Sequence, residues 1–312
     1  MNSQVQQLIE ALRAAIPPGA PRLWQLPAAQ GRMFADAFMV LRNEGGPEMA
    51  ERRDLTIPGR RGAIGARLYV PRTATALSPG LLYLHGGGFV IGSPDTHDRL
   101  TRELAHDIGA RVLSLHYALA PEHPYPAGLH DCVDASRWLA ANAATLGIDA
   151  KRLVIGGDSA GANLSAATIL RLRAEAAAPA FRAALLIYGR FTGDDTDSMR
   201  AWGERDLILS RPMMEWFERQ YVGDAPDRND PYYAPLAGDL HGFPPSILTV
   251  GTLDQLLDDS RLFAAALEKA GVPAELHVYE DGPHAFAQFA MLDMCGDAIA
   301  KMSAFARKRL EP

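Results

Sequence analysis

Residues 153–161, with the sequence LVIGGDSAG, join a short apolar run to the start of a helical stretch. The run Leu153–Ile155 is typical of a buried strand, and the apolar pattern of Leu164–Ala176 predicts a helix. Between them, Gly157, Ser159 and Gly161 form a G-x-S-x-G motif. A sharp strand-to-helix turn leaves no room for side chains two residues before or after the serine, so both positions require glycine. We therefore predict that Ser159 is a nucleophile at a helix N-terminus, where free N–H groups favour negative charge.

The alternation of strand and helix continues on both sides of this motif. Further short apolar runs lie at 81–84, 112–115, 184–188, 247–250 and 276–279. Helical patterns at 100–108 and 132–144 lie between several of these runs, and two earlier strands are predicted at 54–58 and 66–70. Such alternation implies a largely parallel sheet covered by helices on both faces. The sequence therefore predicts an α/β fold.

The N-terminal region departs from this alternation. The spacing of Val5, Leu8, Ile9 and Leu12 predicts an amphipathic helix that ends at Pro17 and Pro18. A second helix is predicted over 28–41, and its apolar face is formed by Met33, Phe34, Ala37 and Phe38. Periodicity alone leaves two interpretations open: both helices pack on the core, or both cover a pocket.

A long interval also interrupts the alternation. About sixty residues separate Tyr188 from Ile247, and they hold one clear helix near Pro212–Tyr221. A plain connection between two strands is much shorter. We therefore expect this interval to be an insertion at the edge of the sheet.

A second glycine-rich stretch, His85-Gly86-Gly87-Gly88-Phe89, follows the predicted strand 81–84. Consecutive glycines let the backbone approach a substrate closely and aim its N–H groups inward. This pattern is the oxyanion loop that accompanies G-x-S-x-G, and we expect the N–H groups of Gly87, Gly88 and Ala160 to be its donors. A phosphate-binding loop is disfavoured because neither G-x-x-x-x-G-K-[ST] nor G-x-G-x-x-G follows the first strands. His85 is expected to hold the loop by hydrogen bonds.

A serine nucleophile needs a histidine that accepts its proton. The chain has nine histidines, and three of them follow Ser159 as the order serine, acid, histidine requires: His241, His277 and His284. His241 lies in the long interval and precedes Asp254, the best candidate for the acid. His277 lies inside the predicted strand 276–279. His284 follows the carboxyl end of that strand, where chemistry gathers in open α/β sheets. We therefore predict that His284 is the base.

The predicted acid that orients this histidine is Asp254. It follows the strand 247–250 at its carboxyl end, one strand before His284. Asp258 and Asp259 come slightly later in the chain. We interpret both as first-turn residues of the next helix, where negative charge favours the helix dipole.

The composition limits the partners and the location of the protein. A net charge of -6, with scattered basic residues, disfavours a nucleic-acid partner. Cys132 and Cys295 belong to no metal-ligand cluster, and we interpret both as reduced packing residues, although the sequence leaves a disulfide between them open. The first 20 residues lack a signal-peptide pattern, and no apolar run approaches the length of a membrane span. We expect a cytoplasmic protein without stable membrane association.

Together these motifs make the chain similar to the bacterial hormone-sensitive lipase family of esterases, also called family IV. The matching segments are His85–Phe89, Leu119–Ala127, Gly157–Gly161, the segment around Asp254, and His284–Phe286. The resemblance implies the α/β-hydrolase fold, with a mostly parallel eight-stranded sheet flanked by helices and a helical cap. It places the cap at 1–48 and 192–242, and the catalytic core at 49–191 and 243–312.

The resemblance also implies a reaction. Family members hydrolyse short- to medium-chain acyl esters without a cofactor or metal, so this chain is expected to act as a serine carboxylesterase through an acyl-enzyme intermediate. The expected partner is a small-molecule ester, and the expected assembly is a monomer or homodimer. At four positions the chain departs from the usual Asp, Arg, Pro and Gly of the family, which affects local loop support and pocket shape: His116, Ala118, Gln255 and Ala285.

Two other functions stay open on the sequence. An amidase or deacetylase would use the same three residues, and a non-catalytic receptor on this scaffold would be expected to lack the histidine. An interfacial lipase is disfavoured, because an apolar pattern more often packs against the core, as we expect for Trp24, Phe34, Phe38 and Met39. The candidate cap contacts are Phe191, Trp202, Met213, Trp216 and Phe217.

Overall fold

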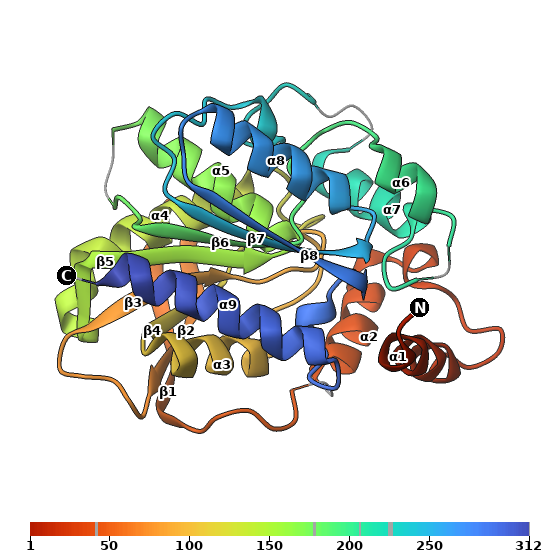
Figure 1. Ribbon diagram of the computed structural model, residues 1–312, viewed down its shortest axis with the longest axis horizontal. Coiled ribbons are helices and arrows are strands. Elements are labelled where there is room, and N and C mark those ends of the chain that lie inside the picture. The colour runs from red at the N-terminus through yellow and green to blue at the C-terminus, as the bar shows by residue number, and fades with distance from the viewer. Residues whose placement is uncertain (41–42, 177–178, 206, 224–226, 312) are drawn as a thin grey trace.

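The computed structural model describes residues 1–40, 43–176, 179–205, 207–223 and 227–311. Its centre is an eight-stranded sheet with the order β1-β2-β4-β3-β5-β6-β7-β8 (Figure 1). The strands are β1 (Met49–Gly59), β2 (Gly62–Pro71), β3 (Ser78–Leu84), β4 (Arg111–His116), β5 (Ile148–Asp158), β6 (Ala183–Ile187), β7 (Ser246–Leu253) and β8 (Ala274–Pro283). β2 is antiparallel to β1 and β4, and all other neighbours pair in parallel. The expected mostly parallel sheet is confirmed.

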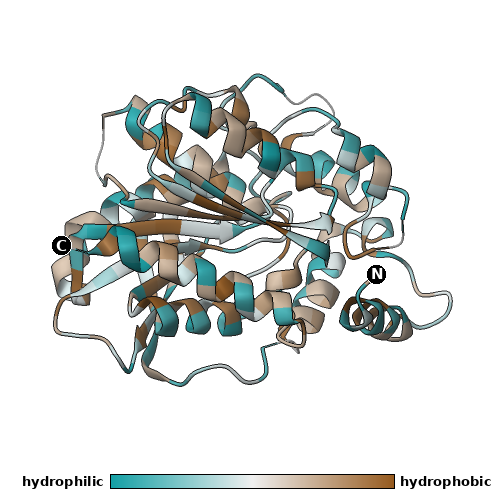
Figure 2. Cartoon of the chain, viewed as in Figure 1, coloured by the Kyte–Doolittle hydropathy of each residue, from teal (hydrophilic) through white to brown (hydrophobic). Residues whose placement is uncertain are grey.

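Helices cover both faces of this sheet. α4 (Ala127–Asn142), α5 (Ala160–Ala174) and α8 (Leu257–Lys269) lie on one face, and α3 (Asp98–Ile108) and α9 (Asp293–Leu310) lie on the other (Figure 1). Successive side chains of a strand point to opposite faces. In β3, Leu82 and Leu84 accordingly join the first layer, while Leu81 and Tyr83 join the second. Figure 2 shows apolar residues concentrated along the central strands.

Four further helices gather at one end of the sheet, on the right in Figure 1. They are α1 (Ser3–Ala14), α2 (Ala28–Val40), α6 (Asp197–Trp202) and α7 (Arg211–Val222). The two N-terminal helices match the apolar spacing in the sequence, although residue 41, the expected end of the second, lies outside the described residues. The interval before β7 contains α6 as well as the one helix expected there. Within the described part of the chain, no helix has the length and apolar character that a membrane crossing requires.

The expected burial of an apolar face against the core is wrong for α2. Phe34 is 59% exposed and Phe38 is 37% exposed, and Gly31 is the buried residue of this helix. Trp24 and Met39 are half-buried, against a small cluster that includes Trp216. The apolar side chains face a cavity instead of the core, and periodicity alone does not distinguish these two surroundings.

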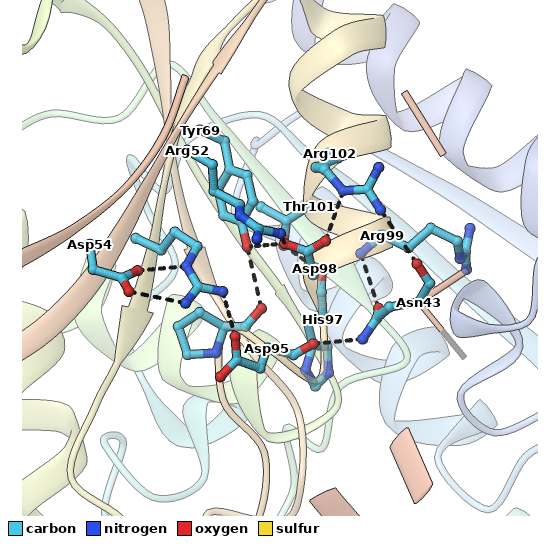
Figure 3. A network of polar contacts seen from close by, with 12 residues as sticks. Asn43, Arg52, Asp54, Tyr69, Asp95, His97, Asp98, Arg99, Thr101 and Arg102 are labelled. Carbon is cyan, nitrogen blue, oxygen red and sulfur yellow. Dashed lines mark hydrogen bonds and ion pairs between the residues drawn. The ribbon is translucent and has the colours of Figure 1, made fainter. Parts of the chain in front are cut away.

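A polar network ties residues 43–47, ahead of β1, to α3, and Figure 3 shows the part of it around Asn43. The guanidinium of Arg102 donates to the carbonyl oxygens of Pro47 and Gly45, at 2.8 Å each. The Asn43 side chain donates to the carbonyl oxygen of Asp95 at 2.6 Å and accepts from the N–H of Arg99 at 3.0 Å. Because these contacts lie at the N-terminal half of α3, the chain entering the sheet is tied to that helix.

The structure shows no bond between the two cysteines. Cys132 and Cys295 are free and buried, as the interpretation of reduced packing residues requires.

Asp258 and Asp259 both lie in the first turn of α8. Asp259 does more than favour the helix dipole, because it is fully buried and accepts the N–H groups of Phe191 and Thr192 at 2.7 and 2.8 Å. Burial raises the pKa of Asp259 from 3.8 to about 7.

Replacing Asp259 by asparagine tests this buried carboxyl. Because the folded-state pKa lies above the unfolded value, the wild type loses stability as pH rises from about 4 to about 7, and the loss then levels off. Relative to Asp259→Asn, which cannot titrate, the free energy of unfolding should fall by about 3 kcal/mol between pH 5 and pH 8. Urea unfolding of both proteins at the two pH values measures this difference, and an identical pH dependence would contradict the assignment.

Candidate active site

Ser159 sits on a sharp turn between β5 and α5. Its backbone has a φ of 53° and a ψ of -117°, a strained conformation for a residue with a side chain. A Cβ atom at Gly157 would lie 2.2 Å from the carbonyl oxygen of Leu84, and one at Gly161 would lie 1.9 Å from it. The two glycines of the motif are therefore required by close packing against the end of β3.

The structure brings Ser159, His284 and Asp254 into one hydrogen-bonded chain. The Nε2 atom of His284 lies 3.0 Å from the Oγ atom of Ser159, and its Nδ1 atom lies 2.8 Å from Oδ2 of Asp254. Asp254 is fully buried, and its other oxygen accepts the N–H of Leu256 at 2.9 Å. With Nδ1–H donating to the carboxylate, Nε2 presents a lone pair to the serine hydroxyl. This arrangement can withdraw a proton from Ser159.

The other two histidines after Ser159 lie elsewhere. His241 is exposed and pairs with Asp239 at 2.7 Å, while His277 lies within β8 and is 3.7 Å from Glu275. His284 differs because β8 ends at Pro283, so the imidazole extends from the end of the sheet. Among these three histidines, His284 alone lies within hydrogen-bonding distance of the Ser159 hydroxyl.

The oxyanion loop, His85–Phe89, begins directly beside the serine turn because Leu84 pairs with Gly157. Gly87 and Gly88 have φ values of 118° and 57°, which favour glycine. Among the hydrogen bonds of the described residues, none uses the N–H group of Gly87, Gly88 or Ala160. Three unpaired donors at the start of the loop and of α5 are what an oxyanion site requires.

His85 has a structural environment. Its Nδ1 atom lies 2.8 Å from the carbonyl oxygen of Gly86, and its ring stacks on Tyr117 with centroids 4.3 Å apart. Burial lowers the pKa of His85 to about 3, so the imidazole is neutral near pH 7. A neutral, stacked ring supports the loop without adding charge beside it.

Two residues of α2, Arg32 and Asp36, contact the segment that directly follows the oxyanion loop. Arg32 donates from Nε to the carbonyl oxygen of Val90 at 2.7 Å, and from Nη2 to that of Ala120 at 2.9 Å. Asp36 accepts the N–H of Gly92 at 2.9 Å. Neither residue is among those predicted from the sequence. The available signal was a pair of opposite charges four positions apart on an otherwise apolar helix.

Above the serine lies a cavity of about 650 Å³, open at one side. Its walls are mainly apolar and come from both the N-terminal region and α7, including Trp24, Phe34, Phe38, Met213 and Phe217. Met213 and Phe217 are thus the two proposed cap contacts that line it. The other three lie elsewhere: Phe191 stacks on Phe263 in the core, Trp216 packs beside Leu23 and Trp24, and Trp202 lies under Arg205.

The four positions at which the chain departs from the family pattern make local contacts or have an unusual backbone conformation. Gln255 is buried, and its side chain donates to the carbonyl oxygen of Leu209 at 2.7 Å, which ties the Asp254 segment to the insertion before β7. Ala285 has a φ of 62°, a conformation that favours glycine. Ala118 donates its N–H to Asp131 at 2.9 Å, and His116 ends β4. None of these residues interrupts the serine, histidine and aspartate chain.

A family model and two relatives match most of the chain. A family model described as alpha/beta hydrolase fold matches residues 81–288, from β3 through the oxyanion loop to Gln288. Esterase LipI of Mycobacterium tuberculosis is 37% identical over 243 residues, covering 76% of this chain and 75% of that protein. Ethyl acetate hydrolase of Pseudomonas putida is 36% identical over 244 residues, covering 77% of this chain and 76% of that protein.

Solved structures are similar over nearly the whole chain. An ester hydrolase from the metagenome of Lake Arreo, complexed with a bipyridine phosphonate derivative, has a TM-score of 0.94 and 33% identity, covering 99% of this chain and 98% of that one. A hyperthermophilic esterase from the archaeon Pyrobaculum calidifontis has a TM-score of 0.89 and 33% identity over the same shares. The chain therefore belongs to the α/β-hydrolase fold family, within its hormone sensitive lipase-like group of esterases.

Proposed function

We propose that this protein is a serine carboxylesterase that hydrolyses short- to medium-chain acyl esters through an acyl-enzyme formed on Ser159. The observation that carries the proposal is the 3.0 Å contact between His284 Nε2 and Ser159 Oγ, beside unpaired backbone donors. Relatives named as esterases and as an ethyl acetate hydrolase support the bond class.

The first half of the reaction forms the acyl-enzyme. The Ser159 hydroxyl attacks the ester carbonyl carbon while His284 Nε2 takes its proton, and the Asp254 carboxylate stabilises the imidazolium that results. The carbonyl oxygen becomes an oxyanion that accepts N–H groups from Gly87, Gly88 and Ala160, each worth about 3 kcal/mol. The imidazolium then protonates the alcohol oxygen, and the alcohol leaves.

The second half releases the acid. Water enters, gives a proton to His284 and attacks the acyl carbonyl carbon, and the same donors hold the second oxyanion. Collapse of this intermediate breaks the bond to Ser159, which recovers its proton from the imidazolium. The cycle needs no group beyond these side chains, the backbone donors and water.

We further propose that residues 1–48 and 192–242 act as a helical cap over a core formed by 49–191 and 243–312. Side chains from α2 and α7 line the cavity above Ser159. Arg32 contacts Val90, the residue after the oxyanion loop, and Ala120, whose N–H donates to the carbonyl oxygen of Phe89 at the end of that loop. The cap then contributes both the apolar pocket and part of the loop support.

Replacing the nucleophile gives the direct test. Ser159→Ala should reduce hydrolysis of nitrophenyl butanoate by at least about 1000-fold while leaving the melting temperature close to that of the wild type, because only the attacking oxygen is removed. Ser303→Ala, in the buried part of α9, is a matched control. Near-normal turnover by Ser159→Ala would refute the assignment.

The cavity predicts an optimum in acyl length. Each added methylene that is buried contributes up to about 0.8 kcal/mol, so kcat/KM for nitrophenyl esters should rise by at most about fourfold per carbon from acetate. The rise should end at a medium chain, where further methylenes extend past the apolar walls of the cavity and stay in water. A panel from acetate to laurate measures this, and a steady increase to laurate would contradict the proposed substrate range.

Removing the α2 contacts tests the cap. Arg32→Met should lower kcat about tenfold, because the carbonyl oxygens of Val90 and Ala120 lose charge-assisted hydrogen bonds and the oxyanion loop loosens. Arg53→Met, at a half-exposed guanidinium on β1, is the control and should retain wild-type kcat. Equal kcat in the two variants would show that α2 does not support the loop.

A further inference from the structure

Asp158, the residue before the serine, is a buried carboxylate that the mechanism above does not use. It is 1% exposed and lies at the end of β5. Its oxygens contact Tyr83 Oη at 2.7 Å, the N–H of Gly86 at 2.9 Å, Gln288 Nε2 at 2.9 Å and His97 Nε2 at 3.3 Å. A buried carboxylate with this many partners is fixed in one orientation.

These partners come from separate reacting segments. Gly86 opens the oxyanion loop, and its N–H is donated to Oδ1 of Asp158. Gln288 ends the segment His284–Gln288, which we call the histidine loop, and it donates to Oδ2. Asp158 itself adjoins Ser159. One carboxylate therefore contacts the serine turn, the oxyanion loop and the histidine loop.

The remaining partners fix the carboxylate from the side of the sheet and α3. Tyr83 is a fully buried β3 residue, and its hydroxyl donates to the same oxygen as the Gly86 N–H. His97, at the N-terminus of α3, also lies 2.8 Å from Gln288 Nε2 and 2.8 Å from Thr96 Oγ1. Tyr83 belongs to β3 and His97 directly precedes α3, so these contacts tie Asp158 to the sheet and to α3.

The ionised form of Asp158 suits a residue that accepts several hydrogen bonds. Burial alone would raise its pKa, but the His97 imidazole and the hydrogen bonds from Tyr83 and Gln288 together hold the pKa well below its ordinary value. An ionised carboxylate only accepts hydrogen bonds. Both oxygens can then accept hydrogen bonds, Oδ1 from Tyr83 and Gly86 and Oδ2 from Gln288.

Space around the carboxylate is equally restricted. A Cβ atom at Gly86 would lie 2.5 Å from Oδ2 of Asp158 and 2.8 Å from its backbone oxygen. The first glycine of the loop thus rests directly on Asp158. A shift of the carboxylate would move Gly86, and with it the donors of Gly87 and Gly88.

We infer that Asp158 is a positioning residue that sets the oxyanion loop and the histidine loop against Ser159, an inference that rests on the proposed function. It touches no reacting atom in this role. It acts through Gly86 on the oxyanion donors, and through Gln288 on the segment that carries His284. A displacement of about 1 Å at such a site can cost about 100-fold in rate.

Asp158→Asn tests the inference, because the amide keeps the shape but replaces one acceptor by a donor. We expect kcat for nitrophenyl butanoate to fall about 10- to 100-fold with KM within about twofold of the wild type, since transition-state contacts are lost selectively. A trifluoromethyl ketone, which forms a tetrahedral adduct with the serine, should bind more weakly by the same factor. A residue with a purely structural role would not lower kcat and the affinity for the trifluoromethyl ketone by the same factor.

The matched control is Asp131→Asn. Asp131 is also buried and accepts one backbone N–H, that of Ala118, but it contacts none of the three segments. Its kcat should equal that of the wild type. Asp158→Asn with the kcat of this control would overturn the inference while leaving the function intact if Ser159→Ala is inactive. Hydrolysis by Ser159→Ala would instead defeat both.

Two milder variants decide the matter if Asp158→Asn does not fold. Gln288→Met removes the link to the histidine loop, and Tyr83→Phe removes one hydroxyl that orients the carboxylate. Each should lower kcat at unchanged KM, by about tenfold for Gln288→Met and less for Tyr83→Phe. Wild-type kcat in both, with circular dichroism showing native structure, would overturn the inference.

Discussion

The close packing of the serine turn against the end of β3 is the constraint on which the site depends. β3 and β5 pair in parallel, and their register sets Leu84 beside Gly157. The carbonyl oxygen of Leu84 leaves no space for a Cβ atom at Gly157 or Gly161. The chain therefore turns sharply at Ser159, and the oxyanion loop leaves β3 alongside it. One pair of neighbouring strands thus brings the proposed nucleophile and its oxyanion donors together.

Three buried aspartates organise the loops at this end of the sheet. Asp254 accepts from Leu256 and contacts His284, Asp158 accepts from Gly86, and Asp259 accepts the backbone N–H groups that follow β6. Buried backbone N–H groups in loops need acceptors, because no strand or helix partner is available to them. A carboxylate can receive several at once. Loops of irregular shape thereby gain acceptors for their backbone N–H groups.

The N-terminal region serves the site in two ways. Its apolar side chains, such as Phe34 and Phe38, remain partly exposed because they face the cavity above Ser159. Its charged side chains Arg32 and Asp36 contact the backbone of Val90 and Gly92, directly after the oxyanion loop. The loop is therefore held from the core by Asp158 and from the opposite side by α2. The same helix, α2, thus lines the cavity above Ser159 and contacts the segment after the oxyanion loop.

Local sequence patterns were enough to predict the α/β fold and the serine, histidine and aspartate that meet at the site. Glycine at Gly157 and Gly161, and the positions of Asp254 and His284 at strand ends, are local requirements that a linear pattern records. The contacts of the apolar face of α2, and the buried acceptor that holds each loop, became clear only in the folded chain. Periodicity shows that a face is apolar but not what it faces. The contacts of Arg32, Asp158 and Asp259 join segments far apart in the chain, and no local spacing encodes such pairings.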